Sequence, residues 1–466
     1  MSTRRLFLQS AAALLAASPA RGAAFQSRRP PLAQRKFASD AVEAKIKQVK
    51  ASLSDPELAW LFENCYPNTL DTTVRHGTLD GKPDTFVITG DIDAMWLRDS
   101  TAQVWPYLPL ARDDRKLQNL LAGVVRRQTR CVLIDPYANA FNFGPTGSEF
   151  AHDHTRMKPE LHERKWEIDS LCYTVRLAHG YWKATGDASC FDKGWQSAAA
   201  LIVKTFREQQ RKENRGPYSF QRDTTNPYDT LPQDGYGNPT HPCGLIHSAF
   251  RPSDDACIFP FLIPSNLFAV TALGQLAEIH ETALSNPSSA GECRALMNEV
   301  SNAIERYART VHEKHGEIYA YEVDGFGNAL LMDDANVPSL LSLPYLGCCA
   351  PDDETYLRTR AFVLSEDNPF FFRGVAEGVG GPHIGPGMIW PLSIIMRALT
   401  SQDEKEIESC LRMLIATTGG AMFMHESFDA HDPGKFTRPW FAWCNSLFGE
   451  LVVRVSEAHP QVLQQI

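Results

Sequence analysis

In the segment Thr89-Gly-Asp-Ile-Asp-Ala-Met-Trp-Leu-Arg-Asp-Ser100, three carboxylates, one guanidinium and one indole fall within nine residues. The acids are Asp91, Asp93 and Asp99, the cation is Arg98 and the ring is Trp96. Buried charges need partners or a ligand, so this segment is poor material for a hydrophobic core. An aromatic ring beside charged hydrogen-bonding groups suits a polyhydroxylated ligand such as a sugar.

The rest of the chain predicts a scaffold of paired helices around this segment. Residues 113–133 carry apolar side chains at helical spacing, and 166–185 and 190–212 form the next pair. Further helices are expected over 291–315 and elsewhere, about twelve or thirteen in total. Because βαβ units are absent, the pattern predicts an all-α fold, and six pairs predict an (α/α)6 barrel with small β-hairpin insertions in the loops. The hairpins are expected at 74–90 and around Asp324-Gly325.

Long loops between the helices hold many of the acidic, histidine and aromatic residues. In a toroid such loops gather on one face, where binding residues are common. The loops expected to form this rim are 89–99, 135–165, 214–263, 366–387 and 419–439.

Composition narrows the function classes. The 466 residues are 43% hydrophobic and 22% charged, and the net charge is −9. An acidic chain is a poor candidate for binding nucleic acid or anionic membranes. It has no apolar run of about 18 residues, so no membrane span is predicted. The oligomeric state stays open.

The N-terminus has the order of an export signal. Arg4-Arg5 precede a mostly apolar stretch, and small residues follow near residue 24. This arrangement resembles a bacterial twin-arginine signal, so residues 1–24 are expected to be removed on export to the periplasm or the medium. Residues 25–38 are expected to be a flexible leader, and 39–466 a single catalytic domain.

Eleven cysteines are scattered along the chain, and none lies at the spacing of a zinc site. Cys172 and Cys410 fall within apolar helical runs, which favours buried free thiols. An exported protein can form disulfides, and their pairing stays open.

Two acidic groups are candidates for catalysis. Cleaving an acetal takes one carboxylic acid to protonate the leaving oxygen and a second carboxylate as nucleophile or as base for water. Asp254-Asp255 follows an aromatic residue, and adjacent acids raise one another's pKa. Glu426 lies between a double glycine and an aromatic segment. The structural alternatives are a helix N-cap for the aspartates and a surface acid for Glu426.

A metal site is a competing interpretation. His152 and His154, together with Asp91 and Asp93, offer nitrogen and oxygen ligands for zinc, manganese or calcium. The alternative is that these histidines hydrogen-bond substrate or loop carbonyls.

Six motifs, in chain order, together resemble glycoside hydrolase family 125. They are Thr89–Tyr107, Trp166–Ser170, Phe250–Asp255, Ile263–Asn266, Gly387–Pro391 and Met424–Phe428. The resemblance extends over nearly everything after residue 40. It implies an (α/α)6 barrel that hydrolyses terminal α-1,6-linked mannose with inversion, without a metal or other cofactor. The implied substrate is a mannose-containing oligosaccharide or N-glycan.

The resemblance also assigns roles to residues. Asp254 is the first choice for the general acid, Asp255 the reserve, and Glu426 the general base. The implied substrate-binding residues are Asp91, Asp93, Trp96, Arg98, Asp99, Asp169, Arg251, Trp390 and His425. Two other hypotheses remain: a metal-dependent α-mannosidase or lyase, and a non-catalytic glycan-binding protein on the same scaffold.

Overall fold

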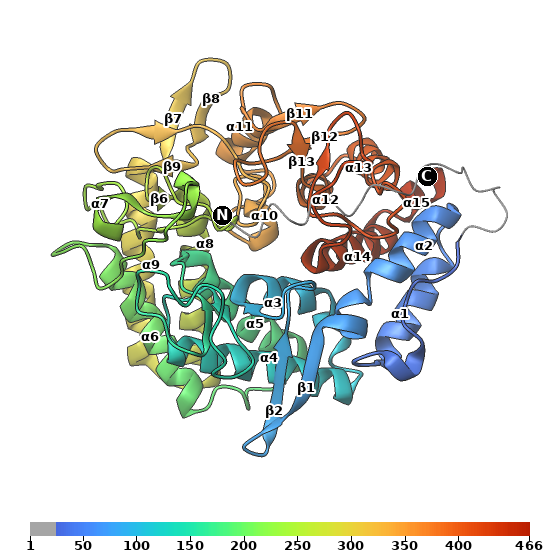
Figure 1. Ribbon diagram of the computed structural model, residues 1–466, viewed down its shortest axis with the longest axis horizontal. Helices are drawn as coiled ribbons and strands as arrows, with labels where there is room; N and C mark the ends of the chain where they lie inside the picture. Colours follow the sequence, from blue (N-terminus) through green and yellow to red (C-terminus); the bar gives the residue numbers. More distant parts are fainter. Residues whose placement is uncertain (1–24) are drawn as a thin grey trace.

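The computed structural model describes residues 25–466, so the predicted export signal at 1–24 lies outside the described residues. Fifteen α-helices within this range form a ring, seen along its short axis in Figure 1. The helices are α1 (Asp40–Lys50), α2 (Pro56–Cys65), α3 (Leu97–Val104), α4 (Arg115–Ile134), α5 (Ile168–Thr185), α6 (Lys193–Gln209), α7 (Pro232–Gly235), α8 (Ile263–Glu278), α9 (Pro287–Tyr307), α10 (Leu343–Leu346), α11 (Glu354–Val363), α12 (Pro391–Leu399), α13 (Glu404–Ala416), α14 (Ala442–Ala458) and α15 (Pro460–Gln465).

The ring has an inner and an outer layer. Helices α3, α5, α8, α12 and α14 are inner elements: α14 packs on α3, α3 on α5, α5 on α8, and α12 on α14. Every residue of α3 is buried, although it includes Arg98 and Asp99. The ring closes where α1 and α2 meet α14, so the first helices of the described range lie beside the last ones (Figure 1). The predicted (α/α)6 barrel is confirmed.

Short strands decorate the loops. The strands are β1 (Val74–Leu79), β2 (Lys82–Val87), β3 (Met95–Trp96), β4 (Ala140–Phe141), β5 (Leu161–Glu163), β6 (Phe261–Leu262), β7 (Arg309–His312), β8 (Gly316–Tyr319), β9 (Glu322–Val323), β10 (Ala329–Leu330), β11 (Phe371–Arg373), β12 (Glu377–Val379), β13 (Met388–Ile389) and β14 (Phe428–Asp429). The predicted hairpin at 74–90 is β1–β2, and the second is β10–β9, which also pairs with β6.

Two expectations differ from the structure. The helix predicted over 291–315 ends at Tyr307, and the antiparallel hairpin β7–β8 follows it. Residues 25–38, expected to be a flexible leader, lie against the barrel instead. Arg29 donates to Asp71 at 2.7 Å, and Lys36 and Phe37 donate backbone N–H groups to the carbonyls of Asp71 and Leu70 at 3.0 Å each. Long-range contacts of this kind leave no trace in local sequence.

The cysteines form no disulfides among the described residues. All eleven lie within 25–466 and are unpaired, and Cys172 and Cys410 are buried as expected.

Across the described part of the chain, none of the helices combines the length and the hydrophobicity that crossing a bilayer would take.

Candidate active site

Arg98 is the centre of a buried cluster of carboxylates at one end of the barrel. Its Nη1 donates to Glu167 Oε2 at 2.6 Å and to Asp169 Oδ2 at 3.1 Å, and its Nη2 donates to Asp254 Oδ1 at 3.1 Å. Asp99 Oδ2 lies 3.7 Å from Arg98 Nε. One guanidinium therefore faces four carboxylates, and burial raises the pKa of Asp99 to about 6.

Local structure explains how these groups meet. Strand β3 pairs with β4, which pairs with β5, and the chain turns from β3 directly into α3. Arg98 and Asp99 therefore stand in the first turn of an inner helix. Glu167 is the N-cap residue of the neighbouring inner helix α5, and Asp169 lies in its first turn. Because α3 and α5 pack together, the ends of both helices point their charged residues into one space.

Asp254 occupies a tight turn that brings it to Arg98. The turn is closed by the bridge between Phe250 and Ala256, and by the Arg251 N–H donating to the Asp255 carbonyl at 2.7 Å. Asp254 itself has φ +66°, a left-handed conformation that is unusual outside glycine. Such backbone strain clusters at functional sites. Lys165 Nζ donates to the Asp254 carbonyl at 2.8 Å and holds the turn from behind.

The two acids Asp254 and Glu167 titrate together. Burial raises the pKa of Glu167 well above its ordinary value despite Arg98. Burial also acts on Asp254, but the positive charges of Arg98 and Lys165 outweigh it and hold the pKa of Asp254 well below its usual range. Burial and the neighbouring cations therefore move the pKa values of the two acids in opposite directions.

Glu426 stands on another loop, just before β14. Thr437 Oγ1 donates to Glu426 Oε2 at 2.7 Å, and Arg438 Nε lies 3.5 Å from Glu426 Oε1. The same Arg438 nitrogen lies 3.5 Å from Asp91 Oδ2. Glu426 is thus oriented by two groups of its own loop, and Asp91 lies at the rim beside it.

His383 joins the two halves of the site, and sequence reasoning missed it. Its Nδ1 lies 3.0 Å from Asp255 Oδ1. Burial lowers the pKa of His383, but Asp255, Glu426 and Asp254 outweigh burial and raise it to about 9. The imidazole is therefore a cation at neutral pH, facing both predicted catalytic loops. Its only sequence signal is its position in the glycine-rich loop 366–387.

Several predicted binding residues border this space. Trp96 meets His162 edge to face with ring centroids 5.2 Å apart, and Trp390 lies 6.3 Å from the His383 ring. The indole N–H of each tryptophan is buried and has no partner among the described residues. Each tryptophan therefore has a donor that no described residue uses.

Four predicted substrate-binding residues are engaged by partners within the protein. Arg251 is fully buried and donates to Glu322 at 2.6 Å, so it anchors the turn from below. His425 is buried with its ring nitrogens facing the carbonyls of Thr418 and Arg438. Asp93 pairs with Arg75 on β1, away from the cluster. Asp169 has no exposed surface and supports Arg98. These positions favour structural roles.

The metal site proposed from His152 and His154 is not assembled. His154 Nε2 lies 3.2 Å from Asp223, whereas Asp91 and Asp93 pair with arginines. Within residues 25–466, a different trio has its ligand atoms within 4.8 Å of one another: His312, His315 and Asp367.

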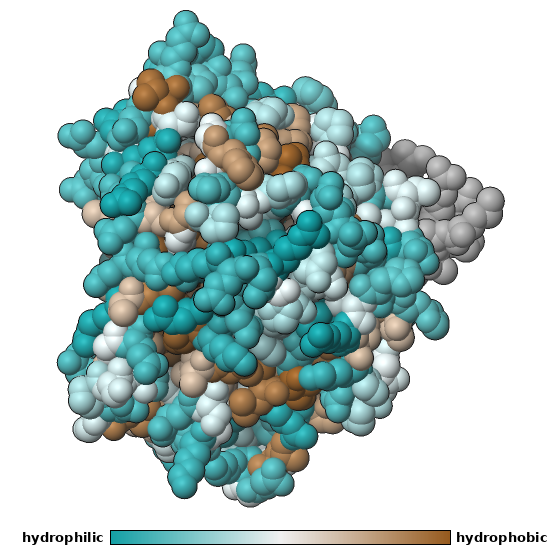
Figure 2. Space-filling model, turned by 90° about the vertical axis from the view of Figure 1, so that its left-hand side faces the viewer, coloured by the Kyte–Doolittle hydropathy of each residue, from teal (hydrophilic) through white to brown (hydrophobic). Residues whose placement is uncertain are grey.

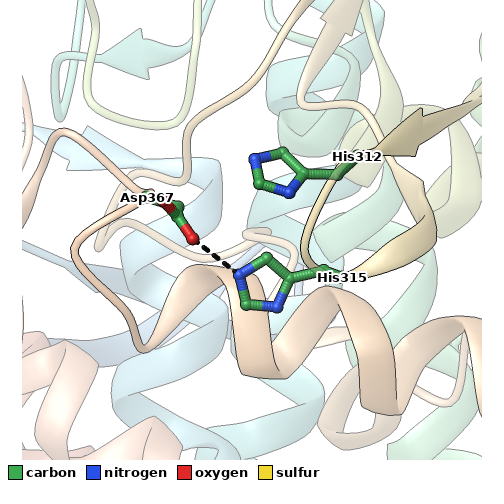
Figure 3. Close-up of side chains that lie close together, drawn as sticks. All are labelled: His312, His315 and Asp367. Atoms are coloured by element: carbon green, nitrogen blue, oxygen red, sulfur yellow. Dashed lines mark hydrogen bonds and ion pairs between the residues drawn. The ribbon is translucent and has the colours of Figure 1, made fainter.

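Figure 3 shows this trio at the β7–β8 hairpin. Asp367 already accepts from His315 Nε2 at 2.9 Å and from Lys314 Nζ at 2.5 Å. The His312 Nδ1 atom accepts the backbone N–H of Lys314 at 3.2 Å. The three side chains are thus engaged in the contacts that fix the hairpin turn.

Comparison with known proteins identifies the family. The model of the metal-independent α-mannosidases, GH125, matches residues 55–453. The meiotically up-regulated gene 157 protein of Schizosaccharomyces pombe is 43% identical over 459 residues, covering 94% of this chain and 90% of the relative.

A solved structure agrees with this result. A metal-independent α-mannosidase from Streptococcus pneumoniae, in a non-productive complex with α-1,6-mannobiose, is 44% identical with a TM-score of 0.87. The match covers 91% of this chain and 100% of that one. The chain belongs to glycoside hydrolase family 125, the metal-independent α-mannosidases.

Proposed function

We propose that the protein is an exo-acting, inverting α-mannosidase that removes terminal α-1,6-linked mannose from oligosaccharides or N-glycans. The observation that carries the proposal is the exposure of the acids around Arg98. The side chain of Asp254 is 27% exposed, whereas those of Glu167 and Asp169 have no exposed surface. Asp254 is therefore the most exposed carboxylate of the cluster, ahead of Asp99 at 8%. The linkage follows the α-1,6-mannobiose bound to the Streptococcus relative.

Asp254 is the proposed general acid, with Asp255 in reserve. Asp254 gives a proton to the leaving oxygen as the C–O bond breaks. It is then left as a carboxylate that accepts from Arg98 Nη2 at 3.1 Å.

Glu426 is the proposed general base. It takes a proton from the water that attacks the anomeric carbon on the face opposite Asp254, which inverts the configuration. The Thr437 hydroxyl and Arg438 fix the direction of the carboxylate. Asp99, Trp96 and Trp390 are the proposed contacts to the terminal mannose, and Arg98 positions Asp254.

Hydrolysis assays test the proposal. Purified protein is incubated with α-1,6-mannobiose and, separately, with α-1,2- and α-1,3-mannobiose, and free mannose is measured. Release from the α-1,6 substrate, lost in Asp254→Asn and Glu426→Gln, is the expected result. The proposed α-1,6 specificity is wrong if another mannobiose is cleaved faster. The assignment of Asp254 as the general acid is wrong if Asp255→Asn alone abolishes activity.

The twin-arginine segment leads us to propose export to the periplasm or the medium as well. Mass spectrometry of the protein from a cell fraction tests this. A mature N-terminus near residue 25 is expected, and a cytoplasmic protein that keeps Met1 or Ser2 refutes export.

A further inference from the structure

An open hollow of about 770 Å³ lies beside the turn that carries Asp254 and Asp255, and residues 256–258 form part of its wall. Its wall includes His154, Arg222, Tyr228, Asn238, Ala256 and Ile258. We propose that this hollow binds the part of the glycan that leaves when the terminal mannose is cut off. The sugar in the hollow is at least the second one after the scissile bond. The inference rests on the proposed function and adds a chain-length preference to it.

The hollow and the reaction centre share a wall. The Ala256 N–H donates to the Tyr228 carbonyl at 2.7 Å, which ties the catalytic turn to the segment lining the hollow. Lys165 Nζ donates both to the Asp254 carbonyl, at 2.8 Å, and to Asp229 Oδ1, at 2.7 Å. These contacts place the hollow directly beside the turn that carries Asp254, within reach of a glycan chain that extends along this turn.

The charges around the hollow favour a neutral ligand. Arg222 lies within 3.0 Å of carboxylate oxygens of Asp153, Glu163 and Asp229, so its positive charge is already met by three acids. His154 lies 3.2 Å from Asp223. An anionic ligand such as a phosphorylated sugar would have to compete with these carboxylates, whereas a neutral sugar would not.

The remaining groups suit hydroxyls and sugar faces. Tyr228 is half-buried and Ile258 is 38% exposed, which gives an aromatic ring and an aliphatic surface for the apolar face of a pyranose. Asn238 Nδ2 donates to the Ile258 carbonyl at 3.0 Å, which directs its amide and leaves Oδ1 as an acceptor. Figure 2 shows the side of the molecule that lies to the left in Figure 1, near α7, where hydrophilic residues cover most of the surface.

The proposed use of the hollow also gives His154 a role. The His152-Asp-His154 motif has no part in the chemistry at Asp254 and Glu426. Asp153 pairs with Arg222 through two hydrogen bonds of 2.8 and 2.6 Å, so it fixes the loop, and His154 faces the hollow. The motif would then shape the site for the leaving part of the substrate.

The test compares α-1,6-mannobiose with the linear α-1,6-mannotetraose for the wild type, Tyr228→Ala and Asn238→Ala. Neither side chain takes part in the proposed chemistry, and the Tyr228 contact to the catalytic turn is made by its backbone. Tyr307→Ala is the matched control, because Tyr307 is an exposed tyrosine at the end of α9, outside the hollow. For each protein kcat/KM is measured on both sugars.

The wild type should cleave the tetrasaccharide with a kcat/KM about three- to tenfold higher than the disaccharide, the range expected from one aromatic stacking contact. Tyr228→Ala should lose this preference, Asn238→Ala should reduce it, and both should keep the wild-type rate on mannobiose. Equal kcat/KM on the two sugars in the wild type, or a preference that survives in both variants, overturns the inference while the proposed function stands.

If neither sugar is cleaved, the proposed function fails. A binding measurement then tests whether the hollow takes a sugar chain. Calorimetric titration with mannotetraose should then show affinity that Tyr228→Ala weakens and Tyr307→Ala keeps. Equal affinity in all three proteins overturns the inference.

Discussion

Replacing Arg98 with methionine removes the guanidinium that faces Asp99, Glu167, Asp169 and Asp254 and keeps most of the side-chain volume. The structure predicts that this change affects stability as well as activity. Removing one partner from a buried ion pair costs about 3–5 kcal/mol, because the remaining charge is buried without compensation. For a chain of this length, that loss lowers Tm by about 3–5 °C.

The cost of Arg98→Met should depend on pH. In the wild type Arg98 lowers the pKa values of its carboxylate neighbours, and burial raises them. Without Arg98 those pKa values rise further, so the folded variant binds more protons than the folded wild type. The difference in stability should therefore be large at pH 8 and shrink towards pH 5, where the carboxylates take up protons.

Thermal unfolding of both proteins between pH 5 and pH 8 measures this, and circular dichroism checks that the variant folds. Arg98→Lys is the matched control, because it restores a charge without the forked geometry and should recover part of the stability but little activity. A Tm difference below about 1 °C at pH 8, or one that does not change with pH, would show that Arg98 does not compensate the cluster.

Three further predictions concern the reaction. Glu426→Gln should lower kcat by about a hundredfold or more with KM little changed, since removing a general base costs that much; a kcat within fivefold of wild type would exclude the role. The contact of His383 with Asp255 contributes stability that is complete below pH 6.5 and is lost as pH rises through about 9. Loss of the imidazole charge should lower the kcat/KM of the wild type near pH 9, and His383→Gln should not show this fall. The same fall in the variant would show that His383 does not cause it. Dialysis against EDTA should leave kcat unchanged, and loss of activity restored by a divalent cation would contradict the metal-independent mechanism.

Sequence predicted the fold well because its signal is local. Helical periodicity and caps fix elements such as α2, whose N-cap Asp55 accepts from the Leu58 N–H at 2.7 Å. Six helix pairs can then be arranged into a closed ring in only a few ways. The β7–β8 hairpin was missed because the chain runs from α9 into β7 through Ala308 alone, with no glycine or proline to mark the end of the helix.

The site was predicted only in part, because its contacts are long-range. The charged segment around Arg98 was visible as unusual, but its partner Glu167 lies 69 residues away and becomes a neighbour only when α3 and α5 pack. The glycine at position 90 is visible in the sequence, but the reason for it lies far along the chain. Gly90 has φ +118°, and a Cβ there would meet Trp440 at 2.9 Å. Arg251 lies close in sequence to the proposed general acid Asp254, yet its side chain is directed into the protein, where Glu322 binds it.

The central claim is that Asp254 and Glu426 hydrolyse a terminal α-1,6-mannoside with inversion. Proton NMR of α-1,6-mannobiose with enough enzyme to outpace mutarotation tests it directly. With inversion, β-mannose should appear first and α-mannose should follow by mutarotation. Initial release of α-mannose, or no cleavage at all, would contradict it.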